Sequence, residues 1–199
     1  MIGPEHMRVV LRRFATLFGF VAILWVVQGI NWVSGYQLNY LFGLIPREFT
    51  GLDGVIAMPL LHGSFAHLIS NTAPLVLMGG LLAATATRAL LMVNALIVTL
   101  GGALVWLFGS TAVHIGASGL VFGWFGFLVT RGLVDRSFVT LAAAALVAML
   151  YGSLIWGVLP GQPGISWEAH LFGAIAGAAA AVVIRTHVHR PRLNNVERR

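Results

Sequence analysis

Four polar side chains that can do chemistry lie within long apolar runs of this sequence: His67, Asn71, Ser118 and His170. A serine hydroxyl is a weak nucleophile unless a base takes its proton, and an imidazole within hydrogen-bond reach is the usual base. Polar residues in apolar runs are costly, which favours a function for them over chance. Their combination predicts nucleophilic catalysis by a serine and a histidine.

The runs that hold these side chains are apolar enough to lie in a membrane. Of 199 residues, 58% are hydrophobic and only 9% are charged, whereas soluble domains carry about 25% charged residues. A helix of roughly 20 apolar residues crosses a bilayer core of about 30 Å. We therefore expect an all-α integral membrane protein. The absence of cysteine excludes a disulfide framework and a thiolate metal site.

Six apolar runs are expected to form a bundle of six transmembrane helices. The predicted spans are residues 14–33, 58–87, 89–109, 118–130, 138–159 and 168–184. A signal peptide is the competing interpretation of the first run, but Asn31-Trp32-Val33 is a poor cleavage site, so we expect a retained helix. The predicted organisation is a basic head (1–13), a membrane domain (14–184) and a basic tail (185–199).

The positive charge of the chain is best explained by topology. All 12 basic residues are arginines, and every one except Arg47 lies in a terminus, at Arg88 or in the 131–136 loop. The positive-inside rule then places both termini in the cytoplasm of a multi-pass plasma-membrane protein. Loops 34–57, 110–117 and 160–167 are expected outside. Nucleic acid is not an expected partner, and no internal repeat of the transporter kind is visible.

The four polar side chains are expected at a similar depth near the outer face. Ser118 precedes Arg131 by about 20 Å of helix, and His170 precedes Arg185 by about 22 Å. Asn71 comes out slightly shallower, and His67 shallower still. We therefore expect the site to line a cavity that opens to the outer face.

Two pairs of glycines predict that the helices carrying Ser118 and His170 pack closely. Gly119-xxx-Gly123 follows the serine, and Gly173-xxx-Gly177 follows the histidine. Small residues four apart let helix backbones approach each other in lipid. If these faces meet, the hydroxyl and the imidazole come within reach at the tops of the two helices.

His67 and Asn71 are expected to assist the reaction of Ser118 near the outer face, without being nucleophile or base. His67 and Asn71 project from one helix face, where donors suit a developing oxyanion, and the N–H groups of a helix N-terminus add to that effect. His62 and His114 are expected to be loop or interface residues. The tail residues His187 and His189 are expected to be solvated, with a weak metal-binding tail as the alternative.

Each of these features also has a plain structural explanation. A serine at a helix start is more often a cap than a nucleophile, and a membrane histidine can make a structural hydrogen bond. Pairs of glycines four apart are mostly packing signals. The combination of all of them at one depth is what favours catalysis.

Three separated motifs resemble those of the rhomboid family of intramembrane serine proteases. They are His62-Gly63-Ser64-Phe65-Ala66-His67-Leu68-Ile69-Ser70-Asn71, then Gly116-Ala117-Ser118-Gly119, then Ala169-His170-xx-Gly173-xxx-Gly177. The resemblance implies that Ser118 is the nucleophile and His170 its base. It also implies that His67, Asn71 and the Ser118 N–H stabilise the oxyanion, and that Phe122 packs on the base.

The resemblance implies an endopeptidase without cofactor or metal that cleaves transmembrane helices of other proteins near their outer ends. Its expected partners are such substrates and membrane lipids. The tryptophan–arginine pair of the family's first outer loop is missing, and this loop offers Tyr40, Phe42 and Arg47 instead. Glu168 is two residues from His170 and is expected to point elsewhere on the helix, which leaves a dyad and not a triad.

Three other functions stay open at this point. A transporter or channel would use the same polar residues along a substrate or proton path. A histidine-based zinc enzyme would need a third ligand beside His67 and His170. A catalytically silent relative would bind membrane helices without covalent trapping of Ser118.

Overall fold

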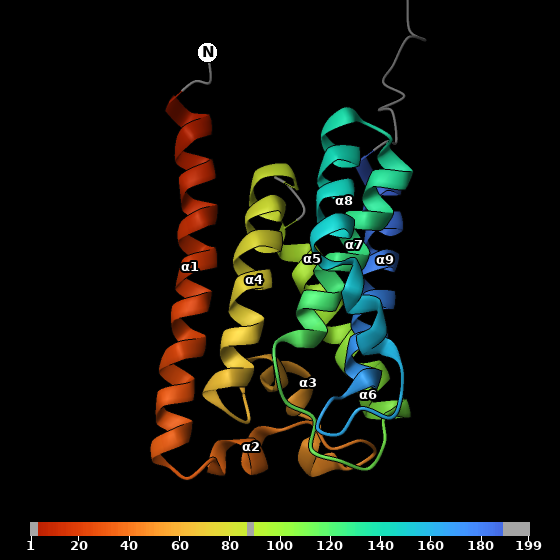
Figure 1. The fold of residues 1–199 in the computed structure, drawn as a ribbon. Coiled ribbons are helices and arrows are strands. Elements are labelled where there is room, and N and C mark those ends of the chain that lie inside the picture. Colours follow the sequence, from red (N-terminus) through yellow and green to blue (C-terminus); the bar gives the residue numbers. More distant parts are fainter. Residues whose placement is uncertain (1–3, 87–89, 189–199) are drawn as a thin grey trace, which may run out of the picture.

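The computed structural model describes residues 4–86 and 90–188 as a bundle of helices (Figure 1). Its elements in chain order are α1 (Pro4–Val33), α2 (Gln37–Phe42), η1 (Phe49–Gly51), α3 (Gly54–Ala57), η2 (Met58–Leu60), α4 (Phe65–Thr85), α5 (Leu90–Leu96), η3 (Ile97–Gly101), α6 (Gly102–Phe108), α7 (Ser118–Asp135), α8 (Phe138–Tyr151), η4 (Gly152–Val158) and α9 (Trp167–Val188). An isolated antiparallel bridge joins Leu44 to His114. The predicted all-α class is confirmed.

Five helical segments in the described ranges are long and apolar enough to cross a membrane. They are Leu11–Val33, Phe65–Thr85, Leu90–Phe108, Phe138–Val158 and Trp167–Ile184. These segments make the chain a multi-pass membrane protein. The sequence predicts six spans, and the one that is not among these five is residues 118–130. These residues belong to α7, whose last turns carry Arg131 and Asp135.

Several predicted boundaries were wrong for local reasons. The second span begins at Phe65 and not at Met58, because Ser64 caps α4 by accepting a hydrogen bond from the N–H of His67 at 3.0 Å. Residues 34–57 are not a plain loop, since they contain α2, η1 and α3. The helix predicted over residues 118–130 continues to Asp135, where Arg131 and Asp135 form an ion pair at 3.0 Å one turn apart.

The core of the bundle is α7, which packs against α9, α8 and α4. Trp124 and Phe127 of α7 are buried among side chains of the surrounding helices. Leu75, Met78 and Leu82 of α4 belong to the same cluster. The helix that begins with Ser118 is therefore held on several sides, which fixes the position of its first residue.

Arg13 and Arg131 lie at one end of the bundle, whereas Arg47 contacts the end of α6 near the other. Arg13 of α1 donates to the carbonyl oxygen of Ala83 at 3.4 Å, and Arg131 of α7 donates to that of Thr85 at 3.0 Å. The N-terminus of α1 lies at this end, and α2 and α3 lie at the other (Figure 1). Ser118 begins α7 at the end opposite to Arg131. Most of the predicted head and tail lies outside the described side chains, which begin at residue 8 and end at residue 184.

Candidate active site

Ser118 is the first residue of α7 and follows a sharp turn of the backbone. Gly116 has φ +118°, in a region that side chains rarely adopt, and its N–H donates to the carbonyl oxygen of Met58 at 3.0 Å. The N-cap position belongs to Ala117, and no side chain caps this helix. The hydroxyl of Ser118 is thus not used as a cap, which was the plain structural explanation for a serine here.

The hydroxyl of Ser118 is paired with the imidazole of His170. Its Oγ lies 2.8 Å from Nε2 of His170, and Nδ1 of the same ring lies 2.9 Å from the carbonyl oxygen of Gly157. A carbonyl oxygen only accepts, so Nδ1 carries the ring proton and Nε2 is left to accept the proton of Ser118. This is the tautomer that a general base needs.

Aromatic packing holds the imidazole in place. The ring of Phe122, one turn after Ser118, stacks on His170 with centroids 4.1 Å apart and planes 7° apart. Gly157 of η4 lies against the edges of both rings, because a methyl group there would lie 2.9 Å from Cζ of Phe122 and 3.1 Å from Nδ1 of His170. His170 is therefore fixed by a ring face, a carbonyl and a hydroxyl.

Close packing of α7 on α9 brings the two residues together. A methyl group at Gly173 would overlap the carbonyl oxygen of Gly119, and one at Gly177 would overlap that of Gly123. The two predicted glycine pairs thus face each other, backbone against backbone. His170 lies one turn before Gly173 and Ser118 just before Gly119, so this contact sets the distance between base and hydroxyl.

His67 lies beside Ser118, whereas the described bond of Asn71 is within its own helix. A methyl group at Gly116 would lie 2.8 Å from Nε2 of His67 and 3.6 Å from Oγ of Ser118, so both side chains border the same point. Nδ2 of Asn71 donates to the carbonyl oxygen of His67 at 3.1 Å. Asn71 is buried and His67 half-buried, one turn apart on α4.

His62 lies in the loop that precedes α4, as expected, and its side chain is buried there. It is 0% exposed, and its Nε2 accepts the N–H of Ala117 at 3.3 Å. Its ring meets that of His67 edge to face, with centroids 5.1 Å apart. His62 lies outside the candidate spans, and its pKa is lowered to about 4, mainly by burial and next by the neighbouring His67, against a smaller opposing effect of the Leu60 backbone. It supports the turn before Ser118 as a neutral ring.

His114 is also buried, and it ties the loop before Ser118 to the start of α9. Its Nε2 donates to the carbonyl oxygen of Ser110 at 3.0 Å, and its Nδ1 lies 2.6 Å from Oγ of Ser166. Glu168 accepts the N–H of Ser110 at 3.1 Å through Oε1. The Glu168 carboxylate is thus directed at this loop and not at His170, which agrees with a dyad.

Sequence reasoning did not assign the contacts of four groups around the site. The carbonyl of Gly157 carries no signal in the sequence, because any residue has one. Asn31 and Asn39 are buried and donate to the carbonyl oxygen of His62, each at 3.3 Å. Their amides within or beside the first apolar run were a readable signal of a buried polar contact. Arg47 donates to the carbonyl oxygen of Gly109 at 2.8 Å, at the end of α6.

Residues with metal-ligand chemistry do not gather in the described part of the chain. Within residues 4–86 and 90–188, no group of three or more histidine, cysteine, aspartate or glutamate side chains could hold a metal ion. The side chain of His187 and the whole of His189 lie outside the described residues, so the alternative of a metal-binding tail stays a prediction.

With this geometry in view, comparison with known proteins decides the family. The model of the rhomboid domain matches residues 50–187, which include Ser118, His170, His67 and Asn71. This chain belongs to the rhomboid family. The resemblance seen in the three motifs is thereby confirmed.

Relatives in this family are similar over most of the chain. The "Uncharacterized protein Rv1337" of Mycobacterium tuberculosis (strain ATCC 25618 / H37Rv) is 38% identical over 186 residues, which are 89% of this chain and 77% of that protein. The "Uncharacterized protein ML1171" of Mycobacterium leprae (strain TN) is 34% identical over 187 residues, which are 89% and 73%. The similarity to these proteins covers most of the chain, whereas the rhomboid domain itself is matched over residues 50–187.

Proposed function

We propose that this rhomboid protein is an intramembrane serine endopeptidase with a dyad of Ser118 and His170. The observation that carries the proposal is the pair of contacts on one ring, 2.8 Å from Nε2 to Oγ of Ser118 and 2.9 Å from Nδ1 to the carbonyl oxygen of Gly157. Together they give the tautomer and the distance for proton transfer. A ring that only capped a helix or bridged two loops would not need both.

The first chemical step is acylation of the serine. Nε2 of His170 takes the proton from Ser118 while Oγ attacks the carbonyl carbon of a substrate peptide bond. The resulting tetrahedral oxyanion lies at the start of α7, where the N–H groups of Ser118, Gly119 and Leu120 precede the first helical bond, from Val121 to Ala117. His170 then gives its proton to the leaving amine, and the carbon–nitrogen bond breaks.

The second step is hydrolysis of the acyl-enzyme. Water gives a proton to Nε2 of His170 and attacks the ester carbonyl, which releases the new carboxylate and returns the proton to Ser118. His67 and Asn71 are proposed to assist the oxyanion in both steps. The position of His67 beside Gly116 and Ser118 supports this role for His67. Asn71 lies one turn away on the same helix, which supports the same role for Asn71.

The proposed substrates are transmembrane helices of other proteins, cut near their outer ends. A helical peptide bond is shielded by its own hydrogen bonds, so the segment must unwind first, and glycine or proline eases that. Six membrane crossings, with α7 as the fourth, and cytoplasmic termini in a plasma membrane complete the proposal. The gathering of Arg13 and Arg131 at the end of the bundle opposite to Ser118 supports this orientation.

Covalent labelling tests the activity directly. The purified protein in detergent is exposed to a fluorophosphonate, and the modified residue is found by mass. We expect one label on Ser118, lost in Ser118→Ala and in His170→Ala. Ser153→Ala is the matched control, because Ser153 is exposed on η4, the same segment that holds Gly157.

Labelling that is equal in His170→Ala, or absent in protein shown to be folded, would contradict the dyad. Absence would then direct attention to a silent helix-binding relative or to transport. The orientation is tested separately, because the chain has no cysteine. Thr111→Cys should react with an impermeant maleimide from outside intact cells, and Ser137→Cys should not.

A further inference from the structure

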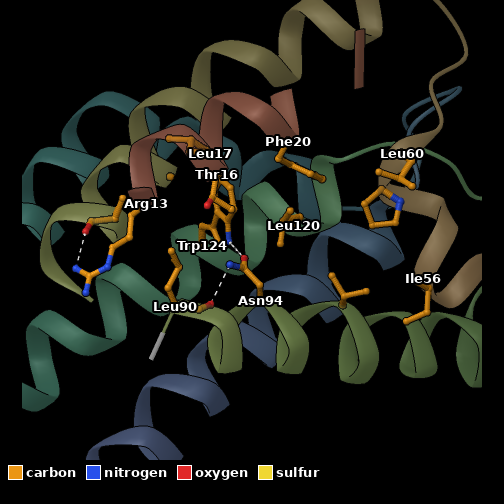
Figure 2. Close-up of a pocket in the computed structure, with 14 residues that line it drawn as sticks. Arg13, Thr16, Leu17, Phe20, Ile56, Leu60, Leu90, Asn94, Leu120 and Trp124 are labelled. Atoms are coloured by element: carbon orange, nitrogen blue, oxygen red, sulfur yellow. Dashed lines mark hydrogen bonds between the residues drawn. The ribbon is translucent and has the colours of Figure 1, made fainter. Parts of the chain in front are cut away.

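A cavity of about 360 Å³ lies between α1, α4, α5 and α7 (Figure 2). Its walls include Arg13, Leu17 and Phe20 of α1, Asn94 of α5, and Trp124 of α7. Neither Ser118 nor His170 lines it. Pockets that hold small ligands typically measure about 300–1,000 Å³, so the cavity is large enough for a guest and the proposed chemistry makes no use of it.

The cavity is long and narrow, and it runs along the helices. Its wall on α1 extends from Arg13 to Phe20, about 10 Å, and its opposite wall from Leu90 to Val98, about 12 Å. Ile56 and Leu60 lie at the far end. A single extended hydrocarbon chain fits a cavity of this length and volume.

The walls are apolar and offer a guest few free polar groups. Oδ1 of Asn94 accepts the indole N–H of Trp124 at 2.7 Å, and Nδ2 of Asn94 donates to the carbonyl oxygen of Leu90 at 2.9 Å. The hydroxyl of Thr16 donates to the carbonyl oxygen of Arg12 at 2.9 Å. Thr16 and Ile56 are exposed, so the cavity reaches the lipid-facing surface.

Among the described residues that line the cavity, Arg13 at its end is the charged one. Arg13 lies in the first turn of the candidate span Leu11–Val33 and is half-buried. Its described hydrogen bond is a long one, 3.4 Å from Nη1 to the carbonyl oxygen of Ala83, and a guanidinium has five N–H donors. The ion pair found within residues 4–86 and 90–188 joins other residues, Arg131 and Asp135. The cavity thus presents a cation at one end and hydrocarbon beyond it.

We propose that this cavity binds one anionic phospholipid. The headgroup phosphate pairs with Arg13, and one acyl chain lies along α1 toward Leu60. Guanidinium groups bind phosphate through paired, charge-assisted hydrogen bonds. A void among packed helices loses dispersion contacts that an acyl chain restores. The proposal rests on the membrane setting and not on the proposed protease activity, and its test has no proteolytic readout.

Trp124 provides a fluorescent reporter inside the cavity. It is only 3% exposed, so a lipid chain can contact its indole ring only from within the cavity. The other tryptophans, Trp25, Trp32, Trp106, Trp156 and Trp167, are replaced by phenylalanine. The chain is reconstituted in phosphatidylcholine vesicles with a minor fraction of phosphatidylglycerol. Bromine, which quenches tryptophan fluorescence on contact, is placed on the chains of one lipid or the other.

We expect brominated phosphatidylglycerol to quench Trp124 fluorescence several-fold more than the mole fraction of this lipid in the vesicles would predict. In Arg13→Gln the quenching should fall to the value that this mole fraction predicts. Arg12→Gln is the matched control, since Arg12 is exposed on the same helix and does not line the cavity. A chain that keeps only Trp32, which is 59% exposed, should report the bulk ratio with either headgroup. Equal quenching of Trp124 by both lipids, or none, overturns the proposal.

Native mass spectrometry gives a second test that needs no tryptophan replacement. The protein is released from micelles after incubation with equal amounts of the two lipids. We expect one phosphatidylglycerol to be retained by the unmodified chain and by Arg12→Gln, and lost from Arg13→Gln and from Thr16→Phe, which fills the mouth. Retention that is the same in all four chains overturns the assignment.

Discussion

The N–H of Ala117 donates to Nε2 of His62 at 3.3 Å, across 55 residues of sequence. The bond joins the turn before Ser118 to the segment before α4, and it involves a ring that is 0% exposed. Because Nε2 accepts, the ring proton is on Nδ1, and this tautomer exists only while His62 is neutral. The position of Ser118 therefore depends on the protonation state of a residue that takes no part in the proposed chemistry.

Replacement of His62 is expected to cost stability in a way that depends on the acceptor. His62→Leu leaves the buried N–H of Ala117 unpaired, which costs roughly 1–3 kcal/mol. His62→Gln offers an amide oxygen in place of Nε2 and should lose less. The free energy of unfolding, measured by denaturant titration in micelles, distinguishes the two. Equal loss in both variants would mean that packing, and not the hydrogen bond, is what His62 provides.

The same residue is expected to make the protein sensitive to acid. Burial lowers the pKa of His62 to about 4 from 6.5, so between these values the unfolded chain binds a proton that the folded chain does not. Stability should then be full above pH 6.5 and fall as the pH drops toward 4, by about 3 kcal/mol from this residue. Unfolding titrations across that window should show a smaller loss in His62→Gln. An identical pH dependence in the two chains would contradict this account.

Phe122 is expected to act as a positioning residue through His170. Phe122→Leu removes the ring that stacks on the imidazole at 4.1 Å but keeps an apolar side chain. We expect the rate of fluorophosphonate labelling at Ser118 to fall about 10- to 100-fold, because misplacement of a catalytic group by about 1 Å can cost about 100-fold in rate. Folding, followed by circular dichroism, should change little. Phe127→Leu, deeper in α7, is the control that should not slow labelling at equal stability.

A methyl group at the contact between α7 and α9 should separate the dyad. Gly173→Ala would overlap the carbonyl oxygen of Gly119, so one helix must move. We expect a loss of stability of about 1–3 kcal/mol from overpacking and loss of labelling. Gly29→Ala is the matched control in a helix, because a methyl group there has no atom within 4 Å. It should stabilise by about 0.5–1 kcal/mol through helix propensity. Equal effects of both changes would argue against backbone contact.

Gln28 of α1 is expected to be replaceable with a gain in stability. Its side chain is 0% exposed, and neither Oε1 nor Nε2 has a hydrogen-bond partner among residues 4–86 and 90–188. Gln28→Leu should raise the free energy of unfolding by about 1–3 kcal/mol, since a buried polar group without a partner costs about that. Asn31→Leu should lower it, because Nδ2 of Asn31 donates to Oδ1 of Asn39 at 2.8 Å. A loss in Gln28→Leu would indicate a polar role for this residue.

The sequence by itself determined the class, the family and the residues proposed for chemistry. The composition shows that the chain belongs in a membrane, because 9% charged residues are too few for the surface of a soluble protein. Ser118 and His170 stand out because a polar side chain in an apolar run is costly and needs a partner. The glycine spacing after each of them indicated close helix packing, because small residues four apart leave one flat face on each helix.

Only the tertiary structure decided how the site is held. The carbonyl that anchors His170 belongs to Gly157, and a backbone group leaves no trace in the residue types. The bond of His62 to Ala117 and the loop network of His114 join segments far apart in the chain, so spacing could not reveal them. The cavity at Arg13 arises where four helices fail to fill the space between them. Such contacts depend on how helices are placed in three dimensions, which local sequence patterns do not determine.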